Sequence, residues 1–424
     1  MPAPPLVSVS DARRRARRIL PRVVFDYIDG AADDEITMAE NEAAYRDIVF
    51  RPRMAVEMDE ADLSTTVLGT PLDLPVILAP CGLVRLMHPD GAAGAARAAH
   101  RRGTVSILST VAGVALETLA GLPGHRWYQL YAAGGRPEAA TIIERAGAAG
   151  YEALVVTVDT PALGNRERDI RNGVTPPLRM NAHTALTLGP QILVRPQWAA
   201  RMLRDSLTMV GGGVGGGDGG GAAGGRRRRG GSAGRGGGSG EAAAAAAGPD
   251  GVQATSGVGA AGAVAMLASP FTWSDIAWIR DRWSLPLLVK GVLSGDDAQH
   301  AADAGADAVI VSNHGGRQLD GAPATVRVLP EVVDRVGARI PVLVDGGVRR
   351  GGDVVKAVAL GATAVCIGRP YLYALAVAGE SGVEQVLTNL ATEMRRTMRL
   401  LGCASVAELD RSWLDADLSR GLHF

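Results

Sequence analysis

Short apolar runs recur along this chain, and each of them stops at glycine or polar residues. There are eight such runs, rich in valine, isoleucine, leucine or alanine, at residues 75–79, 105–108, 127–130, 153–158, 286–289, 308–311, 341–344 and 364–367. Their near-continuous apolar character predicts strands that are buried on both faces, as in a parallel sheet. Alanine-rich stretches that favour helix separate most of them, at 91–101, 136–148, 296–304 and 351–360. The alternation predicts an α/β fold.

Eight strand–helix units are the number that closes a (β/α)8 TIM barrel. The chain has 424 residues, which is enough for one barrel of about 250 residues with extensions. We predict a single domain over residues 1–424, with an N-terminal segment of helices before the first strand. Active sites of such barrels lie at the carboxyl ends of the strands, so the polar residues that follow the apolar runs are the candidates for chemistry.

The most informative of these strand ends lies after residues 308–311. His314 and Arg317 follow that run on a turn loosened by Gly315 and Gly316. A histidine at the end of a buried strand can act as a base near neutral pH. The planar fork of an arginine fits a carboxylate. This pairing predicts chemistry on a small acid, at the carbon next to its carboxyl group.

Charge and cysteine content exclude several classes of protein. The formal net charge is zero, which gives no electrostatic reason to expect nucleic acid as a partner. Three cysteines, Cys81, Cys366 and Cys403, form no CxxC pair, so we expect neither a disulfide framework nor a metal site. We also expect no secretory signal and no transmembrane helix, because no apolar stretch has the required length. A reducing cytoplasm is the expected compartment.

Residues 211–263 depart from the rest of the chain. Glycine dominates to residue 240, interrupted by four arginines at 226–229, and an alanine run follows. This composition cannot bury a core, so we predict a disordered glycine-rich insertion after the fourth strand. The preceding stretch, 190–202, contains Trp198 among apolar residues and predicts a short amphipathic helix. We expect it to pack against the barrel, with a membrane-surface role as the alternative.

Several motifs together resemble the FMN-dependent 2-hydroxy-acid oxidases and dehydrogenases, a family that includes glycolate oxidase, lactate oxidase and mandelate dehydrogenase. The motifs that carry the resemblance are Leu20 to Tyr27, Thr157 to Pro161, Arg166 to Asp169, Val289 to Gly291, Ser312 to Asp320, Asp345 to Gly351 and Ile367 to Pro370. They cover nearly the whole chain except about 173–268. The resemblance implies an FMN enzyme that oxidises an (S)-2-hydroxy acid to the 2-oxo acid.

The resemblance also implies a set of FMN-binding residues, and elementary chemistry supports most of them. Glycines allow backbone N–H groups to approach the phosphate, and arginines form charge-assisted bonds to it. A fixed cation near N1 of the flavin stabilises its reduced form. The implied phosphate set is Gly346, Gly347, Arg349, Gly368 and Arg369. The implied ring contacts are Ser109, Gln129, Thr157, Lys290 and the backbone of Pro80, Cys81 and Gly82, with Ser312 and Asp345 completing the cofactor site.

For the substrate, the resemblance implies a base and a carboxylate clamp. His314 would be the base, with Asp159 orienting its imidazole. The carboxylate of the substrate would lie between Arg166 and Arg317, and Tyr27 would add a hydroxyl donor. The charge that develops on the 2-hydroxyl oxygen would be stabilised by Tyr131. Whether the base takes the α-proton or the hydroxyl proton stays open, because both routes use the same groups.

Two further features bear on substrate and acceptor. Val111 stands where short-chain glycolate oxidases carry tryptophan, which indicates a roomier pocket and a longer or aromatic substrate. The resemblance leaves the electron acceptor open among oxygen, a quinone and a cytochrome; Gly82 occurs in dehydrogenase-type members. Alternatives are a quinone- or cytochrome-linked (S)-lactate or mandelate dehydrogenase peripheral at the inner face of the membrane, an oxidase of a modified peptide, and a non-enzymatic flavin scaffold. We expect a homo-oligomer, a tetramer or larger.

Overall fold

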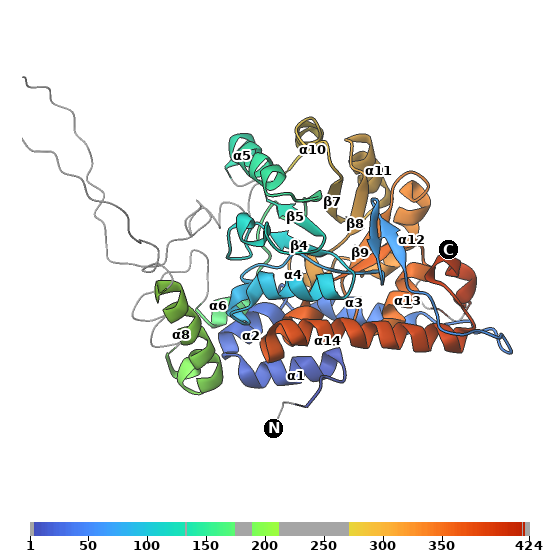
Figure 1. The fold of residues 1–424 in the computed structure, drawn as a ribbon. Coiled ribbons are helices and arrows are strands. Elements are labelled where there is room, and N and C mark those ends of the chain that lie inside the picture. Colours follow the sequence, from blue (N-terminus) through green and yellow to red (C-terminus); the bar gives the residue numbers. More distant parts are fainter. Residues whose placement is uncertain (1–3, 132–133, 174–188, 212–270, 418, 420–424) are drawn as a thin grey trace, which may run out of the picture.

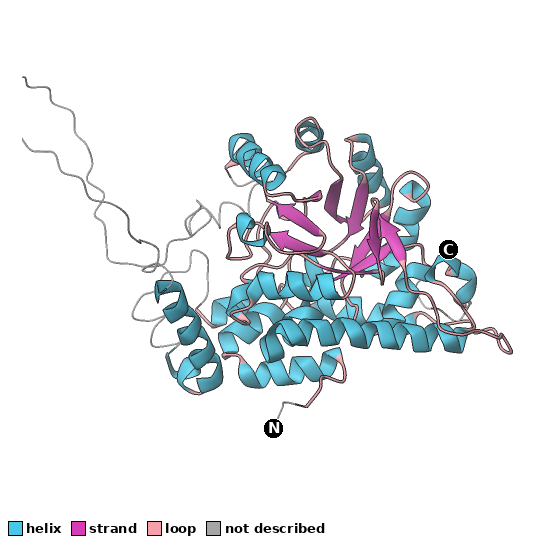
Figure 2. Cartoon of the chain, viewed as in Figure 1, coloured by secondary structure: helices cyan, strands magenta, loops and turns pink. Residues whose placement is uncertain are grey.

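The computed structural model describes residues 4–131, 134–173, 189–211, 271–417 and 419. Its centre is a closed barrel of parallel strands in the order β10-β3-β4-β5-β6-β7-β8-β9 (Figures 1 and 2). The strands are β3 (Val76–Leu78), β4 (Ser106–Ser109), β5 (Arg126–Leu130), β6 (Ala153–Thr157), β7 (Leu287–Val292), β8 (Ala308–Val311), β9 (Val342–Asp345) and β10 (Ala364–Ile367). Each lies within three residues of a predicted apolar run. The predicted (β/α)8 barrel is confirmed.

Helices cover the outside of the barrel between successive strands (Figure 2). They are α4 (Gly91–Arg101), α5 (Gly135–Ala148), α10 (Trp273–Arg280), α11 (Gly295–Asp303), α12 (Thr325–Val336), α13 (Gly351–Ala359) and α14 (Arg369–Leu401). The four predicted alanine-rich helices correspond to α4, α5, α11 and α13. The β4–β5 connection contains instead a short 3-10 helix, Leu116–Leu119.

The N-terminal segment is helical, as predicted, and consists of α1 (Val9–Ile19), α2 (Arg22–Asp29) and α3 (Ile36–Asp47). Helix α1 packs along α14 (Figure 1). Helix α14 is interrupted at Gly379, whose φ of 60° and ψ of −142° are not helical. A Cβ at Gly379 would lie 2.3 Å from Oδ2 of Asp90, so the break brings α14 against the start of α4.

The interior of the barrel is a packed apolar core rather than a channel. Trp127, Leu288 and Ile310 point into it and are fully buried. A hairpin of β1 (Thr65–Val67) and β2 (Thr70–Leu72) adds Val67 and Leu72 to the same cluster, so it closes the N-terminal end of the barrel. Because the described residues fill that end, the carboxyl ends of the strands are the side on which a ligand is expected to bind.

Between β6 and β7 the described chain forms α6 (Glu167–Arg171) and α8 (Pro196–Gly211). The predicted helix at 190–202 is divided in two, because residues 189–193 are helical and α8 begins at Pro196 after a short break. Helix α8 contacts the barrel, as predicted: the indole Nε1 of Trp198 donates to the carbonyl of Leu86 at 2.9 Å. The predicted disordered insertion at 211–263 lies outside the described residues, apart from Gly211, which ends α8.

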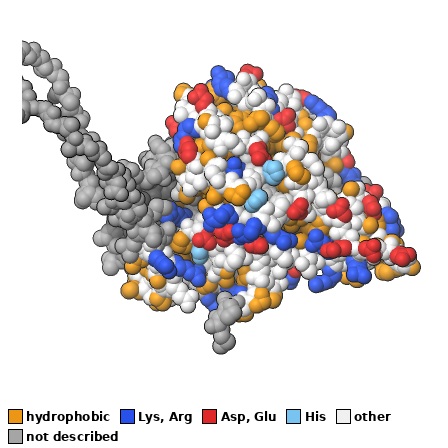
Figure 3. Space-filling model, viewed as in Figure 1, with side chains coloured by type: hydrophobic (Ala, Val, Ile, Leu, Met, Phe, Trp, Pro, Cys, Tyr) orange, Lys and Arg blue, Asp and Glu red, His pale blue; other side chains and the backbone are white. Residues whose placement is uncertain are grey.

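Helices in the described part of the chain are too short or too polar to cross a bilayer. On the face shown in Figure 3, basic and acidic side chains are intermixed, as the zero net charge leads one to expect.

Candidate active site

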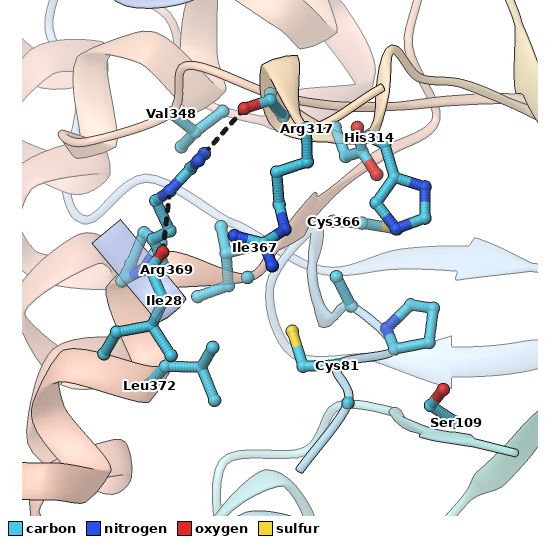
Figure 4. A pocket seen from close by; sticks show the side chains of 18 of the residues that line it. Ile28, Cys81, Ser109, His314, Arg317, Val348, Cys366, Ile367, Arg369 and Leu372 are labelled. Atoms are coloured by element: carbon cyan, nitrogen blue, oxygen red, sulfur yellow. Dashed lines mark hydrogen bonds between the residues drawn. The ribbon is translucent and has the colours of Figure 1, made fainter. Parts of the chain in front are cut away.

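One cavity opens at the carboxyl ends of the barrel strands, and it gathers most of the residues that the sequence singled out. Its empty space is about 1000 Å³, including open solvent at the mouth. The predicted residues that line it are Tyr27, Pro80, Cys81, Gly82, Ser109, Tyr131, Arg166, Lys290, His314, Arg317, Asp345, Gly346, Gly347, Arg349, Gly368 and Arg369. They come from the ends of β3, β4, β5, β7, β8, β9 and β10 and from α2 and α6. Figure 4 shows part of this cavity.

His314 stands at one side of the cavity in a strained backbone conformation. Its φ of 57° is unusual for a residue other than glycine, and the turn after β8 imposes it. The ring Nδ1 lies 3.0 Å from Oδ1 and 3.2 Å from Oδ2 of Asp159, at the end of β6. This contact holds Nδ1 against the carboxylate and leaves Nε2 as the nitrogen that can accept a proton.

The electrostatic setting keeps His314 neutral and Asp159 ionised. Burial lowers the pKa of His314 below its ordinary value, and the nearby charge of Lys290 acts in the same direction, while Asp159 opposes them. Burial alone would raise the pKa of Asp159, but His314 and Lys290 outweigh it, so this pKa is lowered. A neutral imidazole beside a carboxylate is the arrangement that a general base requires.

Two arginines face the same cavity from different elements. Nη1 of Arg317 donates to the carbonyls of Tyr27 and Gly30, at 2.6 and 3.0 Å. Nη2 of Arg166 donates to the amide oxygen of Gln318 at 3.5 Å. Burial and the neighbouring Arg317 lower the pKa of Arg166 to about 10. In the described structure neither guanidinium is hydrogen-bonded to a carboxylate, so the pair can still accept an anion.

Tyrosine hydroxyls complete this side of the cavity. Burial raises the pKa of both Tyr27 and Tyr131, so each keeps its proton and can donate a hydrogen bond. A Cβ at Gly82 would lie 3.0 Å from the Tyr27 hydroxyl and 3.1 Å from a methyl group of Val111. The absence of a side chain at position 82 therefore keeps the space between these two residues open.

The neighbouring strands β4, β5 and β6 carry a chain of neutral hydrogen-bonding groups. Oγ of Ser109 donates to Oε1 of Gln129 at 2.7 Å, and Nε2 of Gln129 donates to Oγ1 of Thr157 at 3.0 Å. These residues stand on adjacent strands, β4, β5 and β6, and are buried. Ser109 lines the cavity, so this chain of hydrogen bonds connects Gln129 and Thr157 to the cavity wall.

A buried cation, Lys290, lies beside Thr157 on the next strand, β7. Nζ of Lys290 is 3.1 Å from Oδ2 of Asp345 and donates to Oγ of Ser312 at 2.7 Å. Burial opposes the charge of Lys290, but Asp345 and Asp159 outweigh it and raise its pKa. Oδ1 of Asp345 is buried without a hydrogen-bond partner in the described structure. Such an orphaned acceptor fits a bound group with hydroxyl donors, as a ribityl chain has.

The glycine turns after β9 are predicted to hold a phosphate, and packing against α3 also requires glycine there. Gly346 and Gly347 have φ values of 93° and 79°. A Cβ at Gly347 would lie 2.0 Å from the carbonyl oxygen of Asn41 in α3. Asn41 in turn exchanges amide hydrogen bonds of 2.9 Å with Asn313. Sequence reasoning missed Asn41, because no local signal ties α3 to the strand ends.

The two predicted phosphate arginines are used differently. Arg369 donates to the carbonyls of Ile28, Gly315 and Gly30 at 2.8 to 3.0 Å (Figure 4). Arg349 donates one N–H to the carbonyl of Val348 and another to Glu42, so three of its five N–H groups stay available. Backbone glycines, an available guanidinium and the orphaned Asp345 oxygen therefore fit FMN.

The chain is similar to known proteins over nearly its whole length. The family model described as FMN-dependent dehydrogenase matches residues 16–416. A peroxisomal (S)-2-hydroxyacid oxidase, GLO3, of Arabidopsis thaliana is 38% identical over 416 residues, covering 98% of each chain. Glycolate oxidase of Spinacia oleracea is 38% identical, covering 97% of this chain and 96% of its own.

Among solved structures, a monotopic membrane protein, (S)-mandelate dehydrogenase, superposes with a TM-score of 0.78 at 32% identity, covering 97% of this chain and 99% of its own. A mandelate oxidase superposes with a TM-score of 0.73 at 34% identity, covering 96% and 98%. The chain belongs to the FMN-dependent dehydrogenase family. It is an FMN-dependent oxidoreductase of the 2-hydroxy-acid oxidase and dehydrogenase class, as the motifs predicted.

Proposed function

We propose that the enzyme oxidises an (S)-2-hydroxy acid to the 2-oxo acid, with His314 as the base and Arg166 and Arg317 as the carboxylate clamp. The observation that carries the proposal is the meeting of two partly buried guanidinium groups with a histidine–carboxylate pair in one cavity. An acid whose carboxylate lies between the arginines presents its next carbon, with its hydrogen and hydroxyl group, to Nε2 of His314.

Each residue has a separate task in this proposal. The oxidation removes two electrons and two protons from the substrate, and FMN, when bound, would take up the two electrons together with one of the protons. One proton goes to Nε2 of His314, and Asp159 stabilises the imidazolium that forms. The hydroxyl group of Tyr131 donates a hydrogen bond to the 2-hydroxyl oxygen of the substrate, and that of Tyr27 donates a hydrogen bond to the substrate carboxylate. Both keep their protons because burial raises the pKa of each hydroxyl.

Lys290 holds a positive charge close to the flavin site. Its ammonium is buried with a side chain only 5% exposed, so solvent screens it little. We assign Ser109, Gln129 and Thr157 to the polar edge of the ring, and the Pro80–Gly82 backbone to the face where the reaction takes place. The phosphate end is assigned to Gly346, Gly347, Gly368 and Arg349, with Arg369 beside it.

The substrate class follows from the residue at position 111. Val111 lines the cavity with a small side chain next to Gly82. This space accommodates a side chain larger than that of glycolate, and the solved relatives named for mandelate are consistent with an aromatic one. A panel of glycolate, (S)-lactate and (S)-mandelate, added without oxygen to the yellow enzyme, tests this assignment. Fastest bleaching of the flavin absorbance is expected with mandelate, and fastest bleaching with glycolate would overturn it.

The catalytic assignment has its own test. His314→Ala should slow flavin bleaching ~10²- to 10⁴-fold, the usual cost of losing a general base, and FMN should stay bound. His300→Ala, on the outer helix α11, is the matched control and should bleach normally. A near-normal rate in His314→Ala would refute the role of His314 as base.

A second candidate is a dehydrogenase that works at a membrane surface and passes electrons to a quinone. The segment around α8 exposes Leu193, Val194 and Leu203, which are 80%, 64% and 62% accessible. Apolar side chains on a basic segment are typical of interfacial helices, and one solved relative is a monotopic membrane protein. Flotation of the holoenzyme with anionic vesicles, and the rate with a soluble quinone compared with oxygen, distinguish this candidate from a soluble oxidase.

A further inference from the structure

The arginine assigned to the cofactor phosphate already has an anionic partner. Nη2 of Arg349 lies 2.8 Å from Oε1 of Glu42, in α3, and Nη1 donates to the carbonyl of Val348 at 2.8 Å. The Arg349 side chain is 19% exposed and that of Glu42 is 40% exposed, so the pair lies at the edge of the cavity. A phosphate that binds Arg349 must share one guanidinium with a carboxylate.

Other acidic groups near this end are engaged elsewhere. The carboxylate of Asp353 accepts the backbone N–H groups of Arg349 and Arg350 at 2.8 and 2.9 Å, which caps α13. Asp47 pairs with Arg327. Among the described residues, Glu42 is therefore the carboxylate that is joined to the Arg349 side chain. The second cation, Arg369, donates to three backbone carbonyls and forms no ion pair with Glu42 in the described structure.

We propose that Glu42 sets the affinity of the enzyme for its cofactor by opposing the phosphate at Arg349. The inference rests on the proposed phosphate position. A phosphate monoester approaches two negative charges at neutral pH, so a carboxylate on the same guanidinium repels it. The repulsion acts on the phosphate alone. Glu42 consequently weakens the retention of FMN but leaves the binding of riboflavin, which has no phosphate, unchanged.

The test is Glu42→Gln, which keeps the shape of the side chain and removes its charge. Glu40→Gln is the matched control, because Glu40 is an exposed glutamate two residues away on the same helix. Holoenzyme is diluted in series, and released FMN is measured by its fluorescence; riboflavin is titrated in parallel. The dissociation constant for FMN should fall about fivefold in Glu42→Gln, since interactions between partly exposed charges reach about that factor, and it should stay unchanged in Glu40→Gln.

Salt provides an independent measurement. The difference between wild type and Glu42→Gln should shrink as ionic strength rises from about 0.05 M to 0.5 M, because screening weakens the repulsion. A thermal melt of each variant checks that the fold is intact. Unchanged or weaker FMN binding in Glu42→Gln, or tighter binding of riboflavin to the same extent, would overturn the proposal.

Arg349→Gln tests whether the phosphate binds at Arg349, independently of the role of Glu42. Loss of FMN affinity with riboflavin unaffected supports the assignment, and Glu42→Gln should then have no effect in the Arg349→Gln background. If Arg349→Gln weakens FMN but Glu42→Gln alone fails to tighten it, the role of Glu42 is refuted and the phosphate site stands. If Arg349→Gln leaves the preference for FMN over riboflavin intact, both are refuted.

Discussion

Replacing Asp159 by asparagine tests the electrostatic reasoning at the centre of the site. The side chain keeps its size and one oxygen that can accept from Nδ1 of His314, but it loses its charge. Proton transfer to His314 creates an imidazolium in a buried position that also holds Lys290 and Arg166. In the variant, the negative charge that lies 3.0 Å from Nδ1 in the wild type is lost, and it no longer offsets the charges of those two cations.

The magnitude follows from the geometry. Two unit charges whose centres lie about 4 Å apart interact by about 4 kcal/mol at an effective dielectric constant of 20. Since about 1.36 kcal/mol corresponds to a factor of ten in rate, the full loss would be about 10³-fold. The side chains of His314 and Asp159 are 20% and 11% exposed, so solvent offsets part of this energy. We expect flavin reduction to slow by about 10²- to 10³-fold.

Stopped-flow bleaching over a range of pH is the assay. The rate falls as His314 becomes protonated, and Asp159 raises the pKa of His314 against the effect of burial. Removing the carboxylate lowers that pKa further, so the acid limb of the profile should move to lower pH. Asp303→Asn, at an exposed site on α11, is the control for loss of one charge. A rate within threefold of wild type, or an acid limb that moves upward, would refute the reasoning.

Three other substitutions address separate parts of the site. Arg317→Lys should lower kcat/KM for 2-hydroxy acids about 10- to 100-fold, because lysine keeps the charge but loses the fork; unchanged steady-state kinetics would remove Arg317 from the clamp. Lys290→Met should shift the flavin midpoint potential to more negative values, and a potentiometric titration without that shift would place Lys290 away from the ring. Gly347→Ala should destabilise the fold by about 3 kcal/mol or more, since its φ is 79° and a Cβ would lie 2.0 Å from the carbonyl oxygen of Asn41; an unaltered melting temperature would contradict this.

Much of the architecture was readable from local patterns. The eight barrel strands lie within three residues of the apolar runs, since a strand buried on both faces requires a continuous apolar sequence. The polar residues after those runs converge on one cavity because parallel strands present their carboxyl ends on the same face. The order of strands along the chain thus already determined that His314 and Lys290 share a site.

Local patterns did not predict which side chains would be bonded to one another. Arg317 was predicted to face a carboxylate, and the structure adds that its Nη1 is held by two carbonyls at the end of α2. Glu42 gave no signal in the sequence, yet it meets Arg349 across 307 residues. Asn41 reaches Asn313 across 272 residues and requires glycine at position 347.

Local patterns were enough to predict the barrel, the end at which its cavity lies and the residue types available there, because hydrophobic periodicity and glycine turns act over a few neighbouring residues. Which charged groups neutralise one another depended on the packing of distant elements. Helices α2 and α3 come to lie over the strand ends through packing, and a guanidinium or carboxylate takes its partner from whatever that packing brings within about 3 Å. Such distances between residues far apart in the chain leave no trace in local sequence.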